Sequence, residues 1–314
     1  MSDLLDNPKP RMACIVPTYN GRNDLPRLLE SIKKQSASFD VFIVDSSSSD
    51  GTDELARSCV QEIVTIPNTQ FNHGGTRQQM VEKYLNYDIY VFMTQDAYLA
   101  DKRSMERLVT PFSDPMVGAV CGRQLPHLDA DVLAVHARFF NYPAESRLKS
   151  MADAAELGIK TPFVSNSFAA YRREALLDVG GFPKHVILSE DTYVAARMLL
   201  KGWKVAYAGD ARCRHSHNYT MAEEFRRYFD TGVFHARESW VRESFGGAGG
   251  EGFRFVKSEL RFLALRRWYL WPASLLRNTL KLLGYKLGRQ ERWLPLWVRR
   301  RLSMHSRFWD RQLS

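Results

Sequence analysis

The feature that most constrains this chain is the alternation of short apolar runs with amphipathic segments over its first 120 residues. The runs with the length of buried strands are MACIV at 12–16, DVFIVD at 40–45, EIVTI at 62–66, DIYVFM at 88–93 and VGAVC at 117–121. Between them, leucine and isoleucine recur at three- and four-residue spacing over 25–32, which predicts a helix, and a second helix is predicted over 76–85. This order predicts an α/β fold whose mainly parallel sheet carries helices on both faces.

The second part of the chain is less regular. Residues 161–176 predict a strand that leads into a helix, 188–203 predict a helix that begins at two acids, and 203–209 predict a further strand. A predicted helix over 222–241 ends before GGAGGEG, whose glycines are typical of a boundary. We therefore expect an α/β domain over 1–245 and a basic helical extension over 246–314.

Positive charge is concentrated in that extension. From Glu251 to Ser314 there are 15 Lys and Arg against 4 Asp and Glu, a net of +11, so the rest of the chain carries −2 of the total +9. Such a segment suits nucleic acid, an acidic partner or an anionic membrane surface. Because no recognised nucleic-acid motif accompanies the charge, we expect no nucleic-acid partner.

The cysteines and the apolar runs indicate a compartment. The four cysteines contain no C-x-x-C pair, which favours a reducing environment and argues against a structural zinc site. The first residues, MSDLLDNPKPRM, lack an apolar core of signal-peptide length, and no apolar run approaches the length of a bilayer span. These observations predict a cytoplasmic protein.

Polar residues follow the predicted strands. PTYN at 17–20, Asp45, FNHGGTR at 71–77 and TQDA at 94–97 each stand where a strand ends. Because ligands of such sheets bind beyond the carboxyl ends of the strands, we expect these residues to meet in one crevice. No G-x-G-x-x-G follows the first strand, so an NAD-dependent oxidoreductase is unsupported.

The residue types in this crevice suggest group transfer. Asp96 and one of the later histidines, His215 or His217, are candidate ligands of a divalent cation. The adjacent acids Glu190 and Asp191 are the candidate catalytic residues, and Asp191 could accept a proton. Taken singly, each has a structural alternative, such as a helix cap or a surface histidine. Together they indicate transfer from a phosphorylated donor to a hydroxyl.

FNHGGTR would add a phosphate cradle to that site. Gly74 and Gly75, at a predicted helix start, would let backbone N–H groups approach a phosphate closely. Arg77 would donate further hydrogen bonds to it. The alternative is a structural turn in which His73 is merely packed.

These residues resemble a known family. PTYN, VDSSSSDGT, TQDA and SED resemble the inverting nucleotide-sugar glycosyltransferases of the GT-A fold. FNHGGTR, FMTQDAYLAD, VCGRQLPH, FVSNSFAAYRRE, LSEDTYVAARM and RHSHNYT resemble bacterial rhamnosyltransferases of O-antigen synthesis, over about 12–253. The resemblance implies dTDP-β-L-rhamnose as donor, an acceptor sugar on undecaprenyl diphosphate, and Mg²⁺ or Mn²⁺ as cofactor.

The resemblance also implies roles for single residues. Asp191 matches the general base, Asp96 a metal ligand, and His215, better than His217, the second metal ligand. Asp45 matches the acid that accepts a hydrogen bond from the pyrimidine N3–H. Thr94 replaces the acid that is common two residues before Asp96. The other expected donor contacts are Pro17, Thr18, Tyr19, Asn20, Asn72, His73, Gly74, Gly75, Arg77 and Gln95, and the acceptor-side contacts are Asn166 and Trp203.

The extension carries an amphipathic pattern that fits a membrane interface. Leu275, Leu276, Leu280 and neighbouring residues fall on one helical side, with Arg277 and Lys281 beside them. We expect peripheral association with the inner face of the plasma membrane. The alternatives are a helical cap on the α/β domain and a homo-oligomer contact. For the activity, the alternatives are a donor such as a UDP-hexose and a non-catalytic, membrane-bound sugar-nucleotide scaffold.

Overall fold

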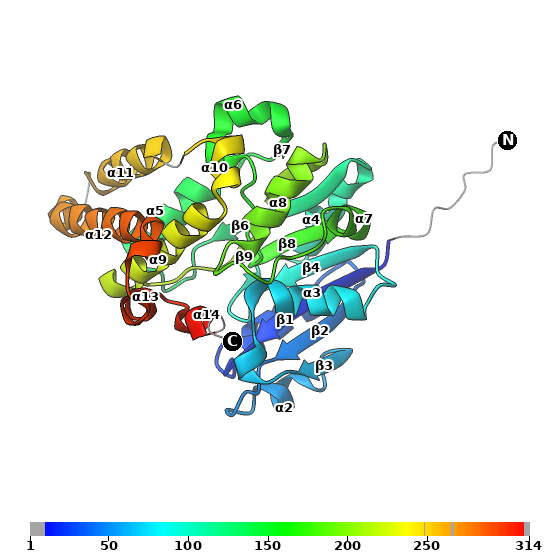
Figure 1. The fold of residues 1–314 in the computed structure, drawn as a ribbon. Coiled ribbons are helices and arrows are strands. Elements are labelled where there is room, and N and C mark those ends of the chain that lie inside the picture. The colour runs from blue at the N-terminus through cyan, green and yellow to red at the C-terminus, as the bar shows by residue number, and fades with distance from the viewer. Residues whose placement is uncertain (1–9, 248, 265–266, 311–314) are drawn as a thin grey trace.

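A computed structural model describes residues 10–247, 249–264 and 267–310, which form a mixed sheet with helices on both faces (Figure 1). The strands are β1 (Met12–Thr18), β2 (Asp40–Asp45), β3 (Glu62–Thr65), β4 (Ile89–Met93), β5 (Tyr98–Leu99), β6 (Val117–Leu125), β7 (Arg147–Lys149), β8 (Phe168–Arg172) and β9 (Lys204–Arg214). Their order in the sheet is β3-β2-β1-β4-β8-β6-β9-β5, and β7 pairs with β9. The predicted α/β class is confirmed.

The first four strands form a parallel half-sheet. β1 pairs in parallel with β2 and β4, and β2 with β3, so that Thr18 lies opposite Asp45. β8 then runs antiparallel between β4 and β6, and β9 runs parallel to β6. The predicted strands are all present, but β6 and β9 extend several residues past their apolar cores. Those extensions, which end at Leu125 and Arg214, are paired with each other.

Helices connect the strands and then continue alone. The α-helices are α1 (Leu25–Lys33), α2 (Thr52–Ala56), α3 (His73–Lys83), α4 (Ser104–Val109), α5 (Val132–Asn141), α6 (Ala154–Leu157), α7 (Arg173–Asp178), α8 (Glu190–Leu200), α9 (Met221–Arg237), α10 (Ser239–Phe245), α11 (Gly249–Ala264), α12 (Trp271–Arg289), α13 (Leu296–Leu302) and α14 (Ser306–Asp310). Short 3-10 helices are η1 (Asn68–Gln70), η2 (Thr110–Ser113), η3 (Met151–Asp153), η4 (Gly158–Lys160), η5 (Trp268–Leu270) and η6 (Glu291–Trp293).

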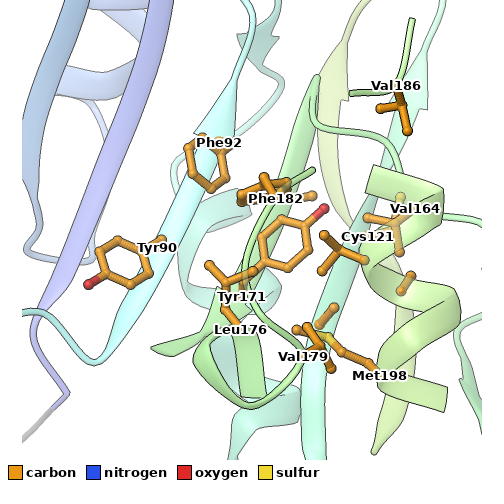
Figure 2. Close-up of a cluster of buried hydrophobic side chains, with 14 of the residues drawn as sticks. Tyr90, Phe92, Cys121, Val164, Tyr171, Leu176, Val179, Phe182, Val186 and Met198 are labelled. Carbon is orange, nitrogen blue, oxygen red and sulfur yellow. The ribbon is translucent and has the colours of Figure 1, made fainter. Parts of the chain in front are cut away.

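The alternation of side chains along each strand divides the core between the two faces of the sheet. Ile15 of β1 belongs to one buried cluster, and its neighbour Val16 belongs to the other. Figure 2 shows part of the first cluster, where the rings of Phe92, Tyr171 and Phe182 meet edge to face. Continuous burial on both faces explains why these strands are uniformly apolar.

The helices of the extension share this core. α12 crosses α9 so closely that a Cβ on Gly288 would lie 1.9 Å from the Phe229 carbonyl oxygen. Trp309 of α14 is fully buried within the same cluster as Phe92. The predicted boundary near 246 therefore separates two stretches of sequence that complete one core. Within the described ranges, no helix is long and apolar enough to cross a membrane.

Candidate active site

The candidate site lies where the carboxyl ends of the parallel strands meet. Asn20, Ser47 and Ser189 are the non-glycine residues with positive φ in the described ranges, and all three stand on loops around this edge. Such backbone conformations cost of order 1–3 kcal/mol and persist where the surroundings impose them, commonly at functional sites. The strain therefore marks the same edge as the polar strand ends.

The loop after β1 is tied to two neighbouring loops. The Gln95 side chain accepts from Tyr19 N at 2.8 Å and donates to Tyr19 O at 3.2 Å. Asn20 N donates to Ser48 Oγ at 2.8 Å, and the Asn20 Oδ1 accepts from Ser49 N at 3.0 Å. Gln95 thus holds the loop in place, while the Tyr19 side chain stays exposed at the rim.

Asp45 is buried beneath this loop. Its carboxylate accepts from Thr18 Oγ1 at 2.9 Å and from the Ser48 backbone and hydroxyl at 2.8 and 2.6 Å. These bonds make Asp45 the cap of the serine turn that follows β2. A contact with a pyrimidine N3–H stays a prediction.

A cavity of about 460 Å³ opens beside these loops. Its lining includes Pro17, Thr18, Tyr19, Asn72, His73, Arg77, Thr94 and Gln95 from the predicted donor set. The cavity is also lined by 304–308, from the far end of the chain. His305 stacks edge to face on His73 with ring centroids 4.8 Å apart, and Arg307 donates to Asn68. Sequence analysis missed this wall, because no motif marks 304–308.

FNHGGTR forms the start of α3, as predicted, but most of its polar groups serve the fold. Asn72 Oδ1 caps the helix by accepting from Gly75 N at 2.7 Å. A Cβ on Gly74 would lie 1.9 Å from the Pro183 carbonyl oxygen, so glycine is required for this packing. Close approach of the Gly74–Gly75 backbone to a phosphate stays a prediction.

Arg77 differs from its expected role. It is 4 % exposed, and its Nη1 lies 3.0 Å from Glu190 Oε1 and donates to His73 O at 2.8 Å. The buried guanidinium therefore neutralises a carboxylate of the protein, and the prediction that it meets phosphate charge is not supported by its contacts.

The adjacent acids at the start of α8 have different surroundings. Burial alone would raise the pKa of Glu190, but Arg77, His73 and the amide of Asn166 outweigh it and hold that pKa below its usual value. Burial, and then the charge of Glu190, raise the pKa of Asp191 to about 7. Asp191 keeps part of its surface accessible, whereas Glu190 is buried. The pair thus supplies one structural anion and one carboxyl poised for proton transfer near neutral pH.

The side chain of Asn166 positions this pair. Its Nδ2 donates to Glu190 Oε1 at 3.0 Å, its backbone N donates to Asp191 Oδ2 at 3.1 Å, and its Oδ1 accepts from Tyr171 at 2.8 Å. With 3 % of its surface exposed, Asn166 is better placed to orient the acids than to meet an acceptor.

Trp203 does not belong to the site. Its indole N–H donates to Asp178 at 3.0 Å, and it packs near Gly118. Both contacts lie beyond the C-terminal end of α8, while Asp191 stands at its N-terminal end. These contacts do not support the predicted acceptor contact of Trp203, because α8 separates Trp203 from Asp191 and places them toward opposite ends of the strands.

Asp96 lies together with both His215 and His217, whereas the sequence predicted that only one of these histidines would reach it. Their potential ligand atoms lie within 4.8 Å of one another, with Asp96 Oδ2 at 3.4 Å from His215 Nε2 and 3.7 Å from His217 Nδ1. Burial lowers the pKa of both imidazoles, that of His217 to about 3. Burial would raise the pKa of Asp96, but hydrogen bonding and the charges of the two histidines lower it overall. Neutral imidazoles beside a carboxylate are in the protonation state that a metal ion needs.

Gln124 of β6 orients this cluster; it lies within the VCGRQLPH string, but no role was predicted for it. Its Oε1 lies 2.9 Å from His215 Nδ1 and accepts the hydrogen bond that Nδ1–H donates. The other ring nitrogen, Nε2, then carries no proton, and its lone pair is directed toward Asp96. The Gln124 Nε2 donates to Ser165 Oγ at 2.9 Å, next to Asn166. The hydrogen bonds of the Asp96, His215 and His217 group, which we call the metal-type cluster, and those of the acid pair therefore reach two adjacent residues, Ser165 and Asn166.

The fold and this crevice are those of a glycosyltransferase with the GT-A fold. Residues 13–180 match the family described as glycosyl transferase family 2, and the chain belongs to that family. It is 52 % identical to the O-antigen chain rhamnosyltransferase RfbN of Salmonella typhimurium, over 96 % of both chains. It is 49 % identical to the O-antigen chain rhamnosyltransferase WbaN of Salmonella anatum, again over 96 % of both. The resemblance read from the motifs is confirmed.

Among solved structures, the chain is similar to a mannosyltransferase from Pyrobaculum calidifontis, determined with GDP-Man and Mn²⁺. The TM-score is 0.60 at 18 % identity, over 89 % of this chain and 88 % of that one. Similarity to S. aureus TarS gives a TM-score of 0.54 at 17 % identity, over 90 % of this chain and 91 % of the other. At these identities the likeness concerns the fold.

Proposed function

We propose that the protein is an inverting rhamnosyltransferase of O-antigen synthesis. It moves L-rhamnose from dTDP-β-L-rhamnose to a hydroxyl of a lipid-linked saccharide. The observation that carries this proposal is the identity of about one half with two O-antigen chain rhamnosyltransferases, which extends over 96 % of the chain.

The donor occupies the cavity beside β1 and β4 in this proposal. The rim residue Tyr19 and the loop held by Gln95 meet the base, and the deoxyribose lies toward Thr94. The Thr94 hydroxyl is buried beside the Asp96 carboxylate, and Thr94 belongs to the lining of the cavity, so the hydroxyl is placed to meet the donor. A hydroxyl in place of an acid suits a deoxyribose, which lacks the 2′-hydroxyl.

Asp96 and His215, with His217 beside them, would hold the divalent cation. Two imidazoles with one carboxylate suit Mn²⁺ better than Mg²⁺, which prefers oxygen ligands. Such an ion, when bound, offsets negative charge on the diphosphate that leaves. The protein's own part is to keep the histidines neutral and His215 aligned through Gln124.

Asp191 acts as the base. Its carboxylate takes the proton of the acceptor hydroxyl while the oxygen forms its bond to the anomeric carbon and dTDP departs from the opposite face. Opposite faces for attack and departure invert the β-linkage to an α-L-rhamnoside. Glu190, neutralised by Arg77, raises the basicity of Asp191 without taking part in the transfer.

The extension brings the enzyme to the membrane, where a lipid-linked acceptor must be met. Leu275, Leu276, Leu282 and Leu283 of α12 are about half exposed, and Trp268 of η5 is 68 % exposed. Exposed leucines and an indole on neighbouring elements are typical of interfacial binding. Arg277 and Lys281, however, face Glu224 inside the molecule, so they do not contribute to this surface as expected.

Binding calorimetry with product analysis tests the function. dTDP-L-rhamnose should bind with Mn²⁺ present and much more weakly without it, and wild-type protein should transfer rhamnose to membrane-extracted lipid-linked saccharide with formation of an α-linkage. Tight binding of UDP-glucose with none of dTDP-rhamnose would replace the donor. Donor binding with no transfer to any membrane extract would favour the non-catalytic scaffold.

A further inference from the structure

A second cavity, which shares no lining residue with the donor cavity, lies beside the cluster of Asp96, His215 and His217. It has a volume of about 330 Å³ and is enclosed by α5, α9, α11 and α12. His217 belongs to its lining, so the cavity adjoins the candidate metal ligands. We name it the acceptor-side cavity. In Figure 1 these four helices lie together, away from β1–β3.

The acceptor-side cavity contains more cations than its acids neutralise. Glu224 already pairs with both Arg277 and Lys281, at 3.5 and 3.1 Å. Glu259 is engaged with Ser274, Asn278 and His136. Asp131 caps α5 by accepting from two backbone N–H groups.

Two arginines of the lining therefore have no acidic partner. Arg138 donates to the neutral Gln124 amide at 2.6 Å, and its Nε is buried without a hydrogen-bond partner among the described residues. Arg227 of α9 forms no ion pair within the described ranges. Guanidinium groups left unpaired in a cavity are suited to phosphate oxygens, with which they form bidentate hydrogen bonds.

The rest of the lining suits a sugar. Tyr142, Phe163, Tyr219, Tyr228 and Phe255 line the cavity. A pocket of aromatic walls with a few placed polar groups is the usual form of a small-molecule site. Lys281 lies over the rings of Tyr228 and Phe255, at 5.8 and 5.3 Å, and so fixes two of these walls.

We propose that the acceptor-side cavity binds the phosphate-bearing end of the acceptor saccharide, with Arg227 and Arg138 on the phosphate oxygens. This inference rests on the proposed function, since it assigns the substrate of the same transfer.

The test compares two acceptors with two variants. One acceptor is a saccharide joined to a short alkyl chain through diphosphate, and the other is the same saccharide on the same chain through a neutral ether. Arg227→Gln removes an exposed, unpaired cation of the cavity, and Arg226→Gln is the matched control, because Arg226 is exposed on the same helix but does not line the cavity. Arg227→Gln should raise the KM for the diphosphate acceptor about tenfold, as expected for loss of a charged hydrogen bond. The KM for the ether acceptor and the Kd of dTDP-rhamnose should not change.

Other outcomes overturn the inference. An unchanged KM for the diphosphate acceptor in Arg227→Gln, or an equal rise for both acceptors, would remove the phosphate from this cavity. An equal rise in the KM for the diphosphate acceptor in Arg226→Gln would show that the effect comes from surface charge in general and not from this cavity. Calorimetric binding of the diphosphate acceptor keeps the two proposals distinguishable. If wild-type protein binds the diphosphate acceptor, Arg227→Gln does not, and neither transfers rhamnose, then the assignment of the phosphate to this cavity is retained and the proposed function is rejected.

Discussion

The sheet region, 12–214, and the helical extension, 249–310, differ in how well the sequence predicted the positions of their charged residues. In the sheet region, Asp96, Asp191 and His215 meet at one edge. In the extension, Arg277 and Lys281 turn inward onto Glu224, while Leu275 and Leu276 face out. Parallel strands bring their carboxyl ends together whatever packs around them, whereas the partner of a helix decides which face is buried.

The largest effect expected in the sheet region is at the base. Asp191→Asn should lower kcat by on the order of 10²–10⁴ while the Kd of dTDP-rhamnose changes little, because the amide cannot take the proton. Asp210→Asn, a surface acid of β9, is the control. Steady-state kinetics and calorimetry give both quantities. An equally large loss of donor binding would assign Asp191 another role.

The extension should prove as necessary to the fold as the sheet is. Trp309→Ala removes a fully buried indole from the main core and should lower the free energy of unfolding by about 3–5 kcal/mol. Trp297→Ala, at a tryptophan that is 70 % exposed, should cost less than about 0.5 kcal/mol. Denaturant titration measures both. Similar small losses would make the extension an independent appendage, as the division at 246 first suggested.

The link between the two halves of the site can be weakened at Gln124. Gln124→Ala removes the acceptor of the His215 Nδ1–H and should weaken Mn²⁺ binding about 10–100-fold, since outer hydrogen-bond partners orient metal ligands. Calorimetry with dTDP present measures it, and Gln61→Ala, at an exposed glutamine, is the control. Unchanged affinity would mean that His215 is held by packing alone.

The acid pair predicts a pH profile. Because burial and Glu190 raise the pKa of Asp191 to about 7, the ionised base becomes more abundant as pH rises. Below that value kcat/KM should fall about tenfold per pH unit, and above it the profile should flatten. A raised carboxyl pKa also means that the folded state binds its proton more tightly than the unfolded state. The free energy of unfolding should therefore decrease as the pH rises from about 4 to 7. At pH 8, Asp191→Asn should melt at a higher temperature than wild type. A flat rate profile between pH 5 and 8 would contradict the assignment.

The smallest effect expected is at the outer face of α12. The double change Leu275→Ser and Leu276→Ser should reduce binding to anionic vesicles severalfold, since each leucine contributes on the order of 1 kcal/mol when half buried. Leu200→Ser, at a similarly exposed leucine of α8, should leave binding unchanged. Vesicle sedimentation separates the cases. Binding lost equally in all variants would point to a general apolar effect.

The sequence alone determined the α/β class, the strands and the residues that follow them. Strands that are buried on both faces need continuous apolar runs, and in a parallel half-sheet the carboxyl ends of these strands lie together. It also indicated the metal-type cluster and the acid pair. The tertiary structure alone decided that Arg77 serves Glu190, that Gln124 and Asn166 hold the site, and that 304–308 wall the donor cavity. Those contacts join residues far apart in the chain, and their partners are fixed only when the helices pack.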